Sequence, residues 1–171
     1  MIILYYHVFE QLGQPSLVKL ADAAARAWMK ALNEDLKPVD LGRALVGGPV
    51  NRVYISRMPA ELADVTIRFG AVNRSQQPDR VAQHGVFGPH HTIMLASDVV
   101  WSVTPWQRFW GIGQEDAYAA LLHEFGHAMG LPHSNINSDV MAPDLGTTVI
   151  SADEARRYRR FLDQPSHPIH A

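Results

Sequence analysis

The chain of 171 residues contains no cysteine. A disulfide framework and a thiolate metal site are therefore both excluded. No stretch approaches the ~18 consecutive apolar residues that a transmembrane helix requires, and the sequence has neither an internal repeat nor a low-complexity tract. Fifteen Lys and Arg residues against seventeen Asp and Glu residues give a net charge of −2. This balance provides no electrostatic attraction to nucleic acid or to an anionic membrane, so we expect neither as a partner.

The remaining composition is that of a small globular protein. Hydrophobic residues make up 47% of the chain, which is enough for one sizeable core, and the length suits a single domain that we expect to be a monomer. Residues 1–9 are apolar but lack a basic segment and a small-residue cleavage site. They predict a buried first strand rather than a signal peptide. We therefore expect either an intracellular protein or a mature, trimmed form of a secreted one.

The most informative segment is residues 123–133, which reads H-E-x-x-H-x-x-G-x-x-H. On a helix, His123 and His127 lie on one face about a turn apart, so both can reach one cation. Glu124 lies on the same turn, where its carboxylate can take a proton from metal-bound water. Gly130 can end the helix in the left-handed conformation and return His133 as third ligand. Three protein ligands with one open position are typical of catalytic zinc.

This motif resembles the zinc signature of the metzincin metallopeptidases, and other residues resemble the matrixin (matrix metalloproteinase-like) branch. Ser134 directly follows the third histidine, as is usual in matrixins. Residues 139–143, which include Met141 and Pro143, are similar to the Met-turn that places a methionine beneath the metal. Residues 150–154 resemble the start of the matrixin C-terminal helix, with a Ser N-cap and a Glu at the third helical position.

The resemblance extends upstream and implies a fold. Residues 63–70 are similar to the third matrixin strand, and residues 92–101 to the strand before the active-site helix. The implied fold class is α+β, a zincin-like catalytic domain. It has a twisted, mostly parallel sheet with an antiparallel edge strand, a long backing helix, an active-site helix and a C-terminal helix. An N-terminal subdomain would span about 1–130 and a C-terminal subdomain about 131–171.

Hydrophobic periodicity predicts the individual elements. Apolar residues at helical spacing indicate the backing helix at residues 16–35. Period-two alternation indicates strands at residues 52–58, 64–69 and 92–97. We predict a long surface loop at 71–89, within which residues 81–88 are our expectation for the edge strand. The active-site helix is expected to begin near Gln114 or Glu115, with acidic residues complementing its dipole.

The resemblance implies a zinc-dependent endopeptidase with one catalytic Zn²⁺. His123, His127 and His133 would hold the metal, and Glu124 would act as general base and then general acid. Gly130, Met141 and Pro143 would support the site. The partner would be an extended peptide or protein substrate that adds a strand to the edge of the sheet. Secreted matrixins are usually kept latent by a propeptide cysteine, and this chain contains no cysteine for that purpose.

Several positions depart from the family pattern and leave a second zinc or a calcium ion open. Met94 stands where a structural zinc-binding histidine is expected, and Ala96 and Val99 stand at acidic calcium-ligand positions. A neighbouring group of histidines is the candidate for a second metal site: His84, His90 and His91. Exposed or hydrogen-bonded histidines are the more common alternative.

The segment between Met141 and Ser151 is relevant to substrate specificity. Only nine residues separate Met141 from Ser151, fewer than is usual in the family loop that encloses the S1′ pocket. We therefore expect a pocket that is shallow or open at its base.

Two other functions also remain open from the sequence: a non-catalytic zinc-binding interaction module, and a zinc hydrolase that acts on cell-wall peptide or on a non-protein amide. Glu124 favours catalysis, because metal ligation alone does not need it.

Overall fold

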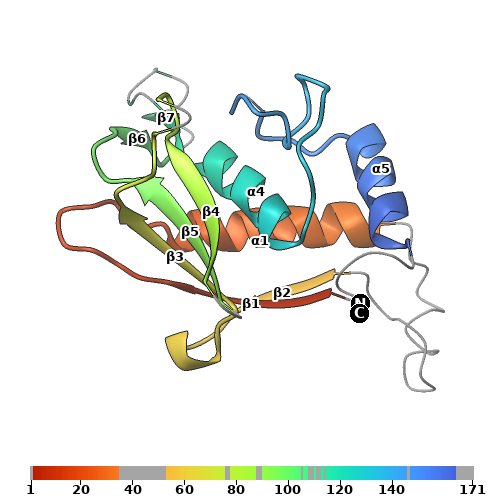
Figure 1. The fold of residues 1–171 in the computed structure, drawn as a ribbon, viewed down its shortest axis with the longest axis horizontal. Coiled ribbons are helices and arrows are strands. Elements are labelled where there is room, and N and C mark those ends of the chain that lie inside the picture. Colours follow the sequence, from red (N-terminus) through yellow and green to blue (C-terminus); the bar gives the residue numbers. More distant parts are fainter. Residues whose placement is uncertain are drawn as a thin grey trace.

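A five-stranded sheet organises the fold (Figure 1). The computed structural model describes residues 2–34, 53–75, 78–87, 90–104, 106–107, 110, 113, 115–145 and 147–164. The strand order is β2-β1-β3-β5-β4. The strands are β1 (Ile2–Val8), β2 (Val53–Arg57), β3 (Val65–Gly70), β4 (Ala82–Phe87) and β5 (His90–Ala96). All neighbours pair in parallel except β4, which pairs antiparallel with β5 at one edge. The expected α+β fold with an antiparallel edge strand is confirmed.

Apolar residues alternate along the strands, so that one face of the sheet is buried in the core. In β1 the buried side chains are Ile2, Leu4, Tyr6 and Val8, with more exposed residues between them. In β3 they are Val65, Ile67 and Phe69. Successive side chains of a strand point to opposite faces, so one face collects the apolar residues and packs against helices. The predicted first strand is therefore present.

Three helices of the described part of the chain accompany the sheet: α1 (Val18–Asn33), α4 (Ala117–Ala128) and α5 (Ala152–Leu162). A short 3₁₀ turn, η1 (Ala60–Leu62), precedes β3. The long α1 contacts β2, α4 and α5, while α4 also contacts β4 and β5 (Figure 1). Residues on one stripe of α1 are buried at helical spacing: Ala21, Ala24, Ala25, Trp28 and Leu32. The long backing helix is thus confirmed. None of the helices in the described part of the chain is long and apolar enough to cross a membrane.

Trp28 links α1 to the helix that carries the zinc motif. Its indole is fully buried, and Nε1 donates a hydrogen bond of 2.8 Å to the backbone oxygen of Leu122 in α4. The ring also meets Tyr158 of α5 edge-on, with centroids 6.1 Å apart. A buried tryptophan contributes a large apolar area, and its N–H finds a partner. Trp28 is therefore a core anchor that fixes the position of α4.

Some predicted boundaries differ from those observed. Helix α1 begins at Val18 rather than at Ser16, whose Oγ donates to Glu10 Oε1 (2.6 Å) and does not cap the helix. The predicted end, Asp35, lies outside the described residues. The loop expected at 71–89 is also too long, because β4 occupies its second half. The predicted edge strand at 81–88 agrees with β4, which begins one residue later at Ala82. Gly88 lies outside the described residues.

The active-site helix also starts later than expected. Glu115 and Asp116 form a short strand, β7, which pairs in parallel with β6 (Trp101–Ser102). Helix α4 then begins at Ala117, and Asp116 is its N-cap. Asp116 Oδ1 accepts hydrogen bonds from the backbone nitrogens of Tyr118 (2.8 Å) and Ala119 (3.3 Å). The acidic pair therefore precedes the helix because it pairs with β6 and caps the first turn. Gln114 lies outside the described residues.

Candidate metal centre

The H-E-x-x-H segment forms the second half of α4, and the third histidine follows a tight reversal. After the C-cap at Met129, Gly130 adopts a φ of +80°. The backbone nitrogen of Leu131 donates to Gly126 O (3.0 Å), which closes the end of the helix. A left-handed residue after the last turn is the position that glycine occupies without steric cost. The predicted helix end at Gly130 is confirmed, and the chain returns His133 towards the helix.

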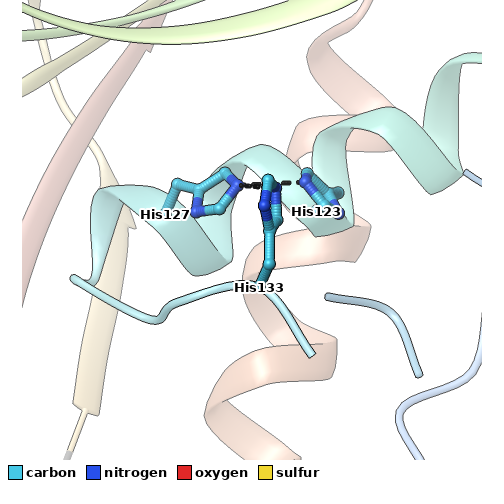
Figure 2. Close-up of side chains that lie close together, drawn as sticks. All are labelled: His123, His127 and His133. Carbon is cyan, nitrogen blue, oxygen red and sulfur yellow. Dashed lines mark hydrogen bonds between the residues drawn. The ribbon is translucent and has the colours of Figure 1, made fainter. Parts of the chain in front are cut away.

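The three imidazoles converge through the same atom of each ring (Figure 2). Nε2 of His127 lies 3.0 Å from Nε2 of His123 and 3.1 Å from Nε2 of His133. All three candidate ligand atoms lie within 4.8 Å of one another. Nitrogen ligands about 2.0–2.1 Å from a tetrahedral zinc ion would be ~3.3 Å apart. The spacing of the three rings is therefore close to that of a zinc site.

Hydrogen bonds at the other ring nitrogen determine which tautomer each helical histidine adopts. Nδ1 of His123 lies 2.9 Å from Val140 O, and Nδ1 of His127 lies 3.0 Å from Leu131 O. A carbonyl oxygen only accepts, so Nδ1 carries the proton and Nε2 keeps its lone pair. The short contact between Nε2 of His123 and Nε2 of His127, drawn in Figure 2, then brings two lone pairs together, an arrangement that a cation would stabilise. Burial lowers the pKa of His123 to about 4, so its ring is neutral at neutral pH.

Glu124 lies beside this cradle with one oxygen free. The residue is only 5% exposed, and Oε2 has no hydrogen-bond partner among the described residues. Burial raises the pKa of Glu124 to about 7, against the opposing effects of the Arg80 guanidinium and the His84 backbone N–H. A buried carboxylate without a partner is costly in a folded protein. Its free oxygen can accept a proton or a hydrogen bond from a molecule bound at the imidazoles.

The segment predicted to form a Met-turn packs directly under α4. Met141 is fully buried, and its Sδ would lie 2.2 Å from a Cβ placed on Gly126. Only a glycine in the middle of the motif allows this approach. The backbone oxygen of Met141 accepts from the backbone nitrogen of Ser134 (2.8 Å), and its nitrogen donates to Glu154 Oε1 (3.2 Å). The chain that carries His133 is thereby tied to α5, whose N-cap is Ser151 as predicted.

A pocket of about 630 Å³ opens at the imidazoles. One wall is the start of the edge strand β4 and the residues before it, from Asp79 to His84. The segment Pro143–Leu145 also lines it. Glu115 of β7 lines the pocket as well. The three histidines and Glu124 therefore face a space large enough for part of a peptide.

Comparison with protein families agrees with this geometry. The family model described as Matrixin matches residues 48–156, which is more than half of the chain. The chain belongs to the matrixin family. Matrixins are zinc-dependent endopeptidases as a family, so the imidazole cradle and the carboxylate beside it are features expected of this matrixin. Comparison with curated proteins gives no match.

The matrixin brings together two of the three histidines predicted as a second metal site. His84 Nε2 lies 2.7 Å from His91 Nδ1, and the two rings are stacked with centroids 5.0 Å apart. His90 is exposed and neighbours His91 along β5, so its side chain points to the other face of the sheet. The described residues contain no group of three metal-ligating side chains besides His123, His127 and His133. Burial lowers the pKa of His84 to about 4.

The positions that depart from the family pattern are filled by apolar contacts. Met94 lies opposite Gln83 in β4, and its Sδ would lie 2.8 Å from a Cβ on Gly70. Ala96 is fully buried, and Val99 packs against the core. These side chains offer no imidazole or carboxylate.

Several charged residues of the pocket wall were not identified as site residues from the sequence: Asp79, Arg80, Glu115 and Asp144. No spacing pattern marks them, because they come from three separate segments of the chain. Glu115 was interpreted only as a partner of the helix dipole. Their place in the sequence was the available indication that they line the site. Arg80 immediately precedes the predicted edge strand, and Glu115 lies just before the active-site helix.

Proposed function

We propose that this matrixin is an endopeptidase that cleaves extended peptide or protein substrates. In this proposal Zn²⁺ is held by Nε2 of His123, His127 and His133, and Glu124 is the general base and then the general acid. One observation carries the proposal: three imidazole nitrogens, two of them kept unprotonated by backbone carbonyls at the other ring nitrogen, converge beside a buried carboxylate oxygen that has no partner among the described residues. A purely structural zinc site would not require that carboxylate.

Each residue then has a defined task. Bound zinc would supply an acidified water and polarise the scissile carbonyl. Glu124 accepts the proton of that water as attack begins and donates it to the leaving amine. A nearby divalent cation favours the ionised carboxylate and so offsets the effect of burial on the pKa of Glu124. The carbonyls of Val140 and Leu131 keep two of the rings in the tautomer that binds metal.

The open edge of β4 is the proposed docking strand for the substrate. Val81 O accepts from the backbone nitrogen of Ala96, so the backbone groups of residue 81 face β5. Alternation in an antiparallel pair then turns the backbone groups of Ala82, His84 and Val86 towards the open edge. A peptide can pair as an additional strand with the groups of Ala82 and Val86, whereas the His84 N–H faces Glu124. We take it to run antiparallel to β4, because antiparallel pairs are the more common arrangement.

Two variants separate metal binding from catalysis. Glu124→Ala should retain zinc but lose cleavage of unfolded casein by about 10²–10⁴-fold, because the general base is gone. His127→Ala should lose both zinc and activity, because a ligand is gone. Zinc content is measured by metal analysis of the purified proteins, and activity by peptide release.

The outcomes decide between the proposal and its rivals. Casein digestion by Glu124→Ala at the wild-type rate would contradict the mechanism. A wild-type protein that holds zinc but cleaves no peptide would instead favour the non-catalytic zinc-binding module.

A further inference from the structure

Glu115 is a carboxylate in the wall of the pocket that the proposed mechanism does not use. It lines the same pocket as Glu124, His123 and Leu145. Its side chain makes no hydrogen bond or ion pair with the described residues, and the residue is neither buried nor fully exposed. Burial raises the pKa of Glu115, and no neighbouring charge contributes to the shift. A partly buried carboxylate without a cation is a natural acceptor for one.

The backbone holds Glu115 in place on both sides. Glu115 pairs with Trp101 in the short β6–β7 sheet, and its nitrogen donates to Val100 O (3.4 Å). The next residue, Asp116, caps α4. His123 lies six residues after the first residue of α4, so Glu115 is on the order of 10 Å from His123 along the helix axis. The residue directly after the scissile bond would need a long side chain to span that distance.

The other charges of the pocket do not neutralise Glu115. Arg80 contributes to the pKa of Glu124, whereas no neighbouring charge contributes to the pKa of Glu115. Asp79 and Asp144 add two more carboxylates to the wall. The pocket therefore favours a positive side chain over a negative one. The segment between Met141 and Ser151 is short and forms only a small part of the pocket wall. We therefore expect the pocket to select substrate side chains by charge more strongly than by length.

The position of this pocket relative to the scissile bond follows from the strand direction. Glu115 shares the pocket with residues 79–82, at the start of β4. Figure 1 shows β7 near that end of β4. A peptide antiparallel to β4 passes the start of β4 with its C-terminal side. The side chain that enters the pocket then belongs to the part of the peptide after the cleaved bond.

We propose that this matrixin prefers Lys or Arg immediately after the scissile bond, and that the Glu115 carboxylate is the acceptor for that cation. Glu115 is a specificity residue in this scheme, and the scheme rests on the proposed endopeptidase function. Lys and Arg combine the required length with a terminal positive charge.

The test uses peptides that differ only at the residue after the cleaved bond: Lys, Arg, Met or Glu. We expect the wild-type kcat/KM to favour Lys and Arg over Met by about tenfold, and this ratio to fall with added salt because the carboxylate is partly solvated. Glu115→Gln keeps the shape and should bring the ratio close to one. Glu115→Lys should favour the Glu peptide. Asp144→Asn removes an equal charge from an exposed residue of the same pocket and should keep most of the preference.

A binding arm separates this inference from the proposed function. Zinc-loaded Glu124→Ala is titrated with the Lys and Met peptides, with and without Glu115→Gln. A Lys preference in binding that depends on Glu115, without turnover by the wild type, would support the pocket and overturn the endopeptidase proposal. Turnover with equal kcat/KM for the Lys and Met peptides would overturn the proposed role of Glu115 in specificity, and so would a Lys preference that survives Glu115→Gln. Either result would leave the endopeptidase proposal unaffected.

Discussion

Individual histidines of this chain are distinguished by the partner of each ring nitrogen. His123 and His127 each direct Nδ1 to a backbone carbonyl, which leaves Nε2 free for a metal. His84 and His91 instead contact each other through one ring nitrogen each, Nε2 of His84 and Nδ1 of His91. A second metal ion at His84 and His91 stays a prediction, because the described residues place no third ligand beside these two rings. The candidate site at His123 and His127 differs in that backbone carbonyls fix the tautomer of both rings.

At the same scale, two glycines with the same backbone conformation provide a matched pair. Gly130 has φ +80° and Gly13 has φ +82°. An alanine at either position meets the steric penalty of the left-handed region, so each variant should lose about 1–2 kcal/mol of unfolding free energy. Only Gly130→Ala should also weaken zinc binding, because the turn at Gly130 returns His133 to the helix. Denaturant unfolding and competition for zinc with a chromophoric chelator measure the two effects.

The Gly13 variant is a clean control because a Cβ there meets nothing within 4 Å. Equal zinc affinity for the two alanine variants would show that the turn at Gly130 does not control the position of His133.

At the scale of elements, α5 is connected to the metal-binding segment by two buried carboxylates. Glu154 is fully buried and accepts from the backbone nitrogen of Met141. Asp139 is 3% exposed, accepts from Ser134 Oγ (2.5 Å) and also from Arg157 of α5. These bonds hold the chain on both sides of His133 and Met141. The C-terminal helix is thus part of the support of the site.

Glu154 makes this connection sensitive to pH. Burial raises the pKa of Glu154 above its ordinary value of 4.5. The folded protein then keeps the proton to higher pH than the unfolded chain does, so wild-type stability falls as the pH rises above 4.5 through the folded pKa. Glu154→Gln keeps an oxygen for Met141 and cannot ionise. Relative to the wild type, the variant should gain unfolding free energy as the pH rises above 4.5 through the folded-state pKa of Glu154.

Urea titrations at several pH values measure this difference. Asp153→Asn is the control, because the neighbouring Asp153 side chain is 70% exposed and should give a much flatter profile. A difference between Glu154→Gln and wild type that stays constant with pH would mean that ionisation of Glu154 has no cost in the folded protein.

Elements were predictable from sequence where local periodicity and packing agree. The alternation in residues 64–69 and the helical stripe around Trp28 reappear in β3 and α1, because each pattern has one buried face. The start of α4 was not predictable, because Glu115 pairs with Trp101, a residue outside the local window. The strand β4 lies in a segment of weak periodicity and is stabilised by pairing with β5. Partners distant in sequence decided both cases.

At the scale of the molecule, the site lies where the sheet edge, α4 and the segment after His133 meet. The H-E-x-x-H-x-x-G-x-x-H motif indicated the candidate ligands because two of them lie on one helix and the third follows a glycine turn. The pocket wall could not be identified in this way. Asp79, Glu115 and Asp144 come from separate segments, and only the folded chain brings them together. Specificity is therefore a property of the tertiary structure, whereas the metal site is largely a property of local sequence.

Zinc should stabilise the whole molecule, because the proposed ligands converge only in the folded chain. Zinc at 100 times its Kd would raise the unfolding free energy by about 2.7 kcal/mol. For a chain of this length that corresponds to an increase in Tm of roughly 5–10 °C. Thermal unfolding followed by circular dichroism, with a strong chelator and after zinc is restored, measures the change. His133→Ala should respond to neither treatment, and Mg²⁺ should not replace zinc, because imidazole ligands do not suit it. A chelator effect of equal size in His133→Ala would place the stabilising metal elsewhere in the protein.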